Sequence, residues 1–119
     1  MIDNNAIFLR YRYDARACTP ANEAQGQGNI GSMPLVKGQW VDVVIQAQFS
    51  YSDDGRIKYW VNGQLIGDYT GGNIYNDKTA GYMKVGLYRW EWKDARLTSR
   101  TVYHDEVRVG DENSSYDEV

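Results

Sequence analysis

Alternation of apolar and polar side chains is the feature that most constrains the fold of this chain. From Trp40 to Tyr51, every second residue is apolar, which places one set of side chains on one face: Val41, Val43, Ile45, Ala47, Phe49 and Tyr51. Most of the intervening residues are polar. A period of two belongs to extended backbone, so this stretch predicts a strand with one buried face.

Shorter stretches with strand character follow the same logic, and no stretch shows a convincing helical period. The further predicted strands are Ala6–Tyr13, Arg56–Val61, Gln64–Tyr69, Tyr82–Trp92 and Thr101–Val109. The turns Ser52–Gly55 and Asn62-Gly63 predict hairpins, because Gly and Asn tolerate the positive φ of tight turns. Residues 14–37 are predicted to form a long loop and residues 111–119 a disordered acidic tail. We therefore expect an all-β, antiparallel β-sandwich over residues 1–110.

Charge and composition exclude several function classes. The net charge is −3, whereas nucleic-acid-binding domains are usually basic, so no nucleic-acid partner is predicted. No run of about 18 apolar residues exists, so no membrane partner is predicted either. The single cysteine, Cys18, allows no disulfide within the chain. No metal and no cofactor are predicted, because carboxylates in turns are more often solvated caps than calcium ligands.

One predicted strand presents a face that is both aromatic and cationic. In Tyr82–Trp92, alternation places these residues on one side: Tyr82, Lys84, Gly86, Tyr88, Trp90 and Trp92. Flat rings stack on the apolar faces of sugars, and lysine or arginine pairs with the carboxylates of uronic acids. This face therefore predicts contact with an acidic glycan.

Other predicted strands carry polar faces of the same kind. The candidate substrate-binding residues there are Arg10, Arg12, Gln46, Gln48, Lys58 and Trp60. If these faces line one concave sheet, they form a groove for an acidic polysaccharide. The alternative is an ordinary antiparallel sheet with a solvated face, since aromatic residues are favoured in any strand.

The segment Tyr82-Met83-Lys84-Val85-Gly86-Leu87-Tyr88 resembles the Tyr-x-Lys-x-Gly-x-Tyr motif of jelly-roll polysaccharide lyases. It is similar to the motif of alginate lyases and closer to that of heparin-lyase-like and glucuronan-lyase-like families. Two further regions resemble the same group. The first region is Lys37–Val44, which is followed by the short motifs Asp54-Gly55-Arg56 and Trp60-Val61-Asn62-Gly63. The second region is Val102–Gly110. The resemblance implies a concanavalin A-like jelly roll.

The resemblance also implies a reaction, β-elimination at a uronic acid. It assigns Tyr88 as the catalytic acid and base and Lys84 as a residue that binds or neutralises charge. The phenol of tyrosine has an unperturbed pKa near 10, so cations such as Lys84 would have to lower it for base work. Independently of the resemblance, the aromatic and cationic face of this segment predicts that Tyr82 and Trp90 contact the substrate.

The chain departs from the pattern of these lyases in its N-terminal part. It has neither the Arg-x-Glu strand nor the Gln-x-His strand, and His104 replaces a tyrosine of the closing strand. We therefore expect the C-terminal part of a lyase jelly roll, incomplete or completed by homo-oligomerisation through its exposed edges. Three functions remain open: a lyase, a non-catalytic carbohydrate-binding module, and a structural oligomerisation module. An extracellular or virion-associated location is expected.

Overall fold

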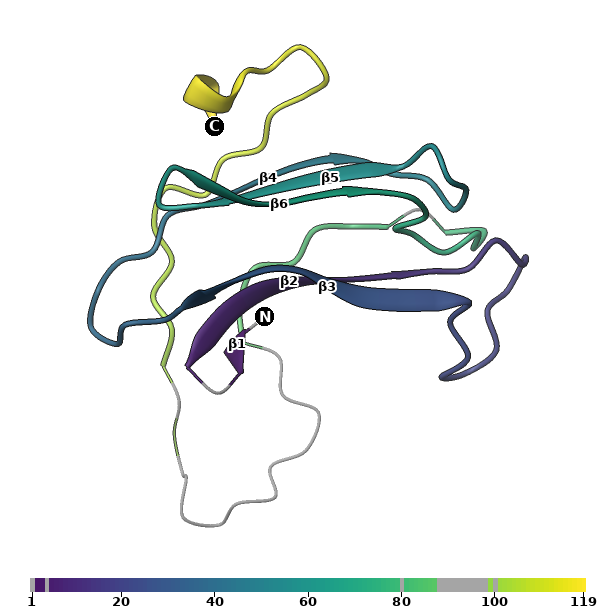
Figure 1. Ribbon diagram of the computed structural model, residues 1–119, viewed down its shortest axis with the longest axis horizontal. Helices are drawn as coiled ribbons and strands as arrows, with labels where there is room; N and C mark the ends of the chain where they lie inside the picture. The colour runs from purple at the N-terminus through teal and green to yellow at the C-terminus, as the bar shows by residue number, and fades with distance from the viewer. Residues whose placement is uncertain (1, 4, 80, 88–98, 100) are drawn as a thin grey trace. The chain divides into compact units, whose positions relative to one another are not determined.

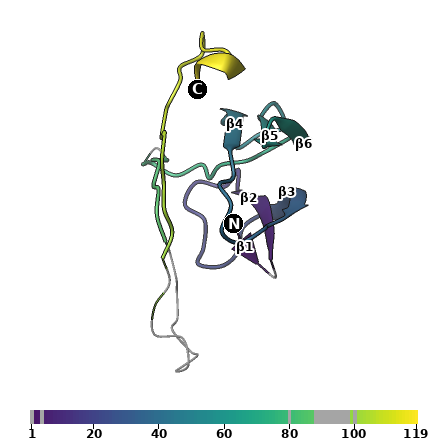
Figure 2. The same cartoon turned by 90° about the vertical axis from the view of Figure 1, so that its left-hand side faces the viewer.

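The computed structural model describes residues 2–3, 5–79, 81–87, 99 and 101–119. The chain divides into two compact units, Met1–Ala80 and Gly81–Val119. The first unit contains every strand of the described residues: β1 (Ile2–Asp3), β2 (Ala6–Tyr13), β3 (Gly26–Pro34), β4 (Val43–Gln48), β5 (Arg56–Val61) and β6 (Gln64–Thr70). They form two antiparallel three-stranded sheets, β1–β2–β3 and β4–β5–β6, which lie as two layers (Figures 1 and 2). The predicted all-β sandwich class is confirmed.

The β4–β5–β6 sheet follows the local sequence signals closely. Ile57, Tyr59 and Val61 of β5 are buried, and the residues between them lie on the opposite face. The β5–β6 turn has positive φ at both Asn62 (49°) and Gly63 (75°), as a tight hairpin requires. The predicted alternation and turn are therefore confirmed.

The two sheets meet through aromatic and aliphatic side chains of β2, β3 and β6. The rings of Tyr11 and Tyr69 lie 4.1 Å apart, centroid to centroid. Burial and the nearby Tyr11 hydroxyl raise the pKa of Tyr69 to about 12. Gly31, at a β-bulge with φ of 61°, lets β3 approach β6 closely, since a Cβ there would lie 2.5 Å from the carbonyl oxygen of Ile66.

A segment after β6, residues 71–76, joins the ends of the two sheets. The buried Asn73 donates from Nδ2 to the carbonyl of Gln48 (2.9 Å) and accepts at Oδ1 from the backbone N–H of Ser50 (3.2 Å). On the other side, the N–H of Asn76 donates to the carbonyl of Asp14 (2.9 Å). We refer to residues 71–76 as the strap.

The predicted loop 14–37 is wrong for Gly26–Pro34, which forms β3. The segment is rich in glycine, which conceals its alternation. Gly26 and Gly28 face the rings of Tyr13 and Tyr11, and a Cβ at either position would lie within 3 Å of those rings. The glycines are therefore a packing requirement of a strand rather than a sign of a loop.

The strand predicted over Trp40–Tyr51 is shorter in the structure, Val43–Gln48. Side chains end it on both sides. The backbone N–H of Asp42 donates to Oδ1 of Asn62 (2.9 Å), while Asn73 takes the backbone N–H of Ser50. Both bonds redirect backbone groups that a longer strand would place in the ladder.

The strand predictions over Tyr82–Trp92 and Thr101–Val109 are wrong for the residues that the structure describes. Residues 82–87 and 101–109 have no ladder with another strand, and a strand is stable only when its N–H and C=O groups are paired. Residues 88–92 lie outside the described ranges. That residues 81–110 complete one sandwich stays a prediction.

The C-terminal segment, predicted to be a disordered tail, contains a short 3-10 helix, η1 (Tyr116–Glu118). The carboxylate of Glu118 accepts hydrogen bonds from the N–H and the hydroxyl of Ser115 (2.7 and 2.9 Å), and these bonds close the turn. In the described part of the chain, no helix is long and apolar enough to span a membrane.

Candidate functional site

Two arginines of β2 lie opposite two amide side chains of β3. In the β2–β3 register, Arg10 faces Asn29 and Arg12 faces Gln27. Nε of Arg10 donates to Oδ1 of Asn29 (3.1 Å). The alternate residues of these strands, such as Tyr11 and Ile30, face the other sheet, so the four polar side chains lie on the outer face of β1–β2–β3. We call this set the arginine–amide patch.

The end of the patch after Arg12 differs from its middle. Arg10 and Arg12 are exposed, and the guanidinium of Arg10 lies 5.7 Å from the centroid of the Phe8 ring. Two residues beyond Arg12, the carboxylate of Asp14 is 0 % exposed. The patch is therefore open at its centre and covered where β2 ends.

The cover over Asp14 is the hairpin loop between β2 and β3. Arg16 binds the Asp14 carboxylate through Nε (2.9 and 3.2 Å) and Nη2 (2.7 Å), and Nη2 also donates to the carbonyl of Glu23. Hydrogen bonding to Arg16 holds the pKa of Asp14 below its usual value, although burial opposes this shift. The Asp14–Arg16 pair thus fixes the loop at a charged, hydrogen-bonded anchor.

A pocket of about 280 Å³ lies between this loop and the arginine–amide patch. Its walls include Arg12, Gln27, Tyr75, Asp77 and loop residues 19–24. The pocket therefore combines one cation and several hydrogen-bonding groups with two carboxylates, since Glu23 belongs to that loop. The carboxylates and the amide suit the hydroxyls of a polyhydroxylated ligand, and Arg12 offers one cation for a carboxylate of that ligand.

The second sheet presents a different outer face. Gln46 lies opposite Lys58, Gln48 opposite Arg56, and Val44 opposite Trp60. Asp68 of β6 lies opposite Lys58 and also binds Arg56, with Nε–Oδ1 of 3.1 Å and Nη2–Oδ2 of 2.8 Å. The Arg56 guanidinium lowers the pKa of Asp68, and Lys58 lowers it further. The cations of this face are thus adjacent to a carboxylate that offsets their charge.

The substrate-binding candidates of the first unit consequently fall into two sets. Arg10 and Arg12 lie on the outer face of one sheet, and Gln46, Gln48, Lys58 and Trp60 lie on the outer face of the other. The two layers of the sandwich separate these faces, so the sets do not line a common groove.

The lyase-motif residues lie in the second unit. The Lys84 ammonium is 4.8 Å from the centroid of the Tyr82 ring, and Tyr82 is 74 % exposed. Tyr88 and Trp90 lie outside the described residues. The predicted roles of these four residues stay predictions.

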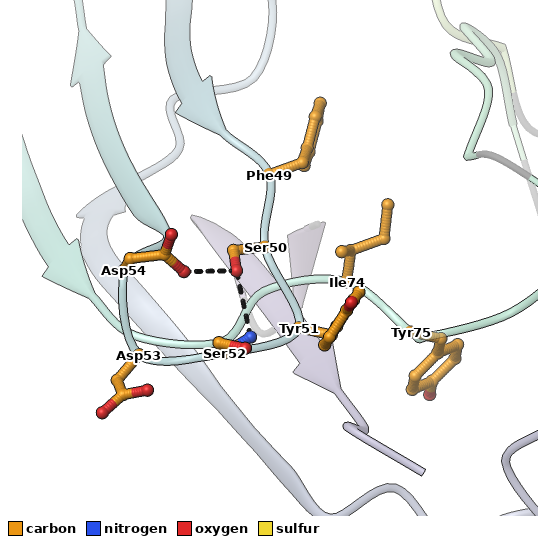
Figure 3. A pocket seen from close by; sticks show the side chains of 8 residues that line it. All are labelled: Phe49, Ser50, Tyr51, Ser52, Asp53, Asp54, Ile74 and Tyr75. Atoms are coloured by element: carbon orange, nitrogen blue, oxygen red, sulfur yellow. Dashed lines mark hydrogen bonds between the residues drawn. The ribbon is translucent and has the colours of Figure 1, made fainter. Parts of the chain in front are cut away.

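A wider pocket of about 740 Å³ adjoins the β4–β5 turn (Figure 3). Phe49 and Tyr51 line it, and its charged lining residues are Asp53 and Asp54. The Ser50 hydroxyl donates to Oδ1 of Asp54 (2.5 Å) and accepts the N–H of Ser52 (3.0 Å), as Figure 3 shows. The negative lining makes this pocket unsuitable for a uronate.

Within the described ranges, no three His, Cys, Asp or Glu side chains come together as metal ligands.

Gln27 and Asn29 were absent from the candidates derived from the sequence. In the sequence, Gln27 and Asn29 alternate with Gly28, as Arg10 and Arg12 alternate with Tyr11. Because Gly28 packs against the Tyr11 ring, this glycine takes the place of an apolar, core-facing residue in the alternation of a strand. The amide pair thus lies beside the arginine pair although some 14 residues of loop and strand separate them in the chain.

Comparison with known proteins gives one match. The protein-family model described as Polysaccharide lyase matches residues 1–108. No curated protein and no solved structure matches the chain significantly. The match covers the arginine–amide patch, both sheets and the segment that contains Lys84 and Tyr88.

Proposed function

The chain belongs to the polysaccharide lyase family, and from this we propose that it binds an acidic, uronic-acid-containing polysaccharide on the arginine–amide patch. The observation that carries the proposal is the pairing of Arg10 with Asn29 and of Arg12 with Gln27 on one exposed face. The guanidinium group offers two parallel N–H donors that match the geometry of a carboxylate. The neighbouring amides can donate to and accept from the hydroxyls of the same sugar.

The charge balance of the two outer faces favours this patch over the β4–β5–β6 face. All four cations lie opposite amide side chains in their registers, but Arg56 and Lys58 also share Asp68. An incoming uronate would compete with Asp68 for Arg56, and part of the binding free energy would be lost in that exchange. At the arginine–amide patch, the uronate meets neutral partners instead.

We further propose that the bound polysaccharide is cleaved by β-elimination. A base removes the proton at C5 of the uronate, the electron pair forms the C4=C5 double bond, and the bond from C4 to the glycosidic oxygen breaks. An acid protonates the departing oxygen. A guanidinium paired with the uronate carboxylate makes the C5 proton more acidic, because it stabilises the charge that develops on the carboxylate. The resemblance to lyases supports Tyr88 as the acid and base and Lys84 as its cationic neighbour.

One experiment separates cleavage from binding alone. The protein is incubated with glucuronan, alginate and heparin, the ultraviolet absorbance of the new C=C bond is followed, and migration is measured in gels that contain each polymer. We expect both an increase in absorbance and retarded migration. Retardation without absorbance would contradict the lyase activity and leave a binding module. The absence of both signals would contradict the whole proposal.

A structural observation also favours a second function, self-association. Among the described residues, β4 pairs on one side only, with β5, and its core-facing Val43 and Ile45 are 40 % and 49 % exposed. A neutral, apolar edge strand is a template for pairing with another chain. We propose that this partner is a second copy of the chain.

A further inference from the structure

The arginine–amide patch is closed at one end. Along β2, the exposed Arg10 and Arg12 are followed by Asp14, which is completely buried beneath the β2–β3 loop. A polysaccharide that followed the strand direction would therefore meet the loop immediately after Arg12. The pocket of about 280 Å³ lies at this end of the patch.

The loop is anchored strongly enough to act as a wall. Besides the Asp14–Arg16 pair, the N–H of Ala15 donates to Oε1 of Gln25 (3.0 Å), and Nδ2 of Asn76 donates to the carbonyl of Ala15 (2.9 Å). Arg16 also holds the carbonyl of Glu23 on the far side of the loop. The loop is therefore bound at both of its ends and to the strap.

The pocket has charges of both signs in its lining. Arg12 and Gln27 form the side that continues the patch, whereas Glu23 and Asp77 contribute carboxylates to the lining. A carboxylate accepts hydrogen bonds from sugar hydroxyls but repels another uronate carboxylate. The pocket therefore suits the hydroxyl-bearing side of a sugar whose carboxylate is held by Arg12.

We propose that this pocket takes the terminal sugar of the polysaccharide, so that the protein recognises chain ends rather than internal stretches. The inference rests on the proposed binding of uronates at the arginine–amide patch. A terminal sugar has a free hydroxyl where an internal sugar has a glycosidic bond, and Glu23 and Asp77 provide acceptors for that hydroxyl. An internal sugar would place its next residue against the anchored loop.

Binding stoichiometry tests this inference. Isothermal titration calorimetry is carried out with the Tyr88→Phe variant, which is expected to bind without cleaving, using uronate oligosaccharides of defined length and the long polymer at equal concentrations of chains. End recognition predicts one protein bound per chain and a constant Kd per chain once the oligosaccharide fills the patch. A number of bound proteins that increases with chain length would overturn end recognition and retain the proposed function. No binding of any uronate would overturn both.

Two further arms identify the end and the residues. Chemical reduction of the sugar at the reducing end opens its ring. Loss of binding would indicate that the pocket takes the reducing end, and unchanged binding would indicate that it takes the non-reducing end.

Glu23→Gln retains the backbone carbonyl that Arg16 uses and removes a charged acceptor. We expect about tenfold weaker binding of short oligosaccharides. The control Glu112→Gln changes an exposed carboxylate of the second unit. Equal affinities of the two variants would contradict the role of Glu23.

Discussion

At the scale of single residues, the site depends on what lies opposite each cation. Arg12 lies opposite the amide of Gln27, whereas Arg56 lies opposite the amide of Gln48 and is also held by a salt bridge to Asp68, although both arginines are exposed on strands. We expect Arg12→Ala to weaken uronate binding by roughly 10- to 100-fold, because a charged hydrogen bond contributes about 1.5–3 kcal/mol. Arg56→Ala, the matched control, should change the Kd less than threefold. Calorimetry with one oligosaccharide measures both, and a larger effect at Arg56 would move the site to the other sheet.

The catalytic role of Tyr88 is tested by removing one atom. Tyr88→Phe retains the ring and eliminates the hydroxyl that would transfer the proton. We expect the increase in ultraviolet absorbance to be lost, with a rate at least 100-fold lower, since general acid–base groups contribute about that much. Binding in affinity gels should persist. A variant that retains the wild-type rate would exclude Tyr88 from the reaction.

Asp14 couples the stability of the fold to pH. Its pKa is lower in the folded protein than the value of about 3.9 in an unfolded chain, chiefly because of hydrogen bonding to Arg16. The resulting stabilisation is present above about pH 4 and is lost as the pH falls through the folded pKa. We expect the free energy of unfolding, measured in urea, to decrease between pH 5 and pH 2. Asp14→Asn should show a smaller decrease, and an identical decrease in both proteins would contradict the assignment.

At the scale of elements, local patterns predicted some strands and concealed others. The alternation of β5 and the Asn62-Gly63 turn predicted the hairpin because its contacts are close in sequence. β3 was not predicted, because its glycines pack against tyrosines of β2. This packing can be recognised only when the pairing of the two strands is known. The ends of β4 are set by Asn62 and Asn73, which come 20 and 25 residues after the backbone groups that they bind. Remote side chains of this kind leave no periodic signal.

Burial within one pair of strands provides a matched stability test. Val61 and Val43 lie directly opposite each other, but Val61 is 0 % exposed and Val43 is 40 % exposed. We expect Val61→Ala to reduce the free energy of unfolding by about 2 kcal/mol, from lost methyl burial and the cavity. Val43→Ala should cost less than about 1 kcal/mol. Urea denaturation of dilute protein measures both, and equal costs would show that the face of β4 is covered.

At the scale of the whole molecule, the sequence assigned side chains to strand faces better than it assigned strands to layers. The predicted candidates of β2, β4 and β5 do lie on strand faces, whereas Tyr82 lies outside the described strands. The prediction that the candidates of the first unit line a single groove is wrong. Alternation assigns a residue to a face of its strand, but it does not say which of the two layers that strand joins. That assignment depends on contacts such as Tyr11 with Tyr69, between residues 58 positions apart.

The sequence of β4 allows an antiparallel register in which two copies of the strand pair with each other. In an antiparallel pair related by a two-fold axis at Ile45, each Ile45 faces its copy and Val43 faces Ala47, so the apolar face continues across the interface. β4 contains no charged residue and no proline, the usual protections of an edge. We therefore expect light scattering to give twice the mass of one chain at high concentration, and Ile45→Lys to give a single chain. Val36→Lys introduces the same charge at an exposed position outside the strands and should remain dimeric. A wild-type protein of monomeric mass at every concentration would contradict this pairing.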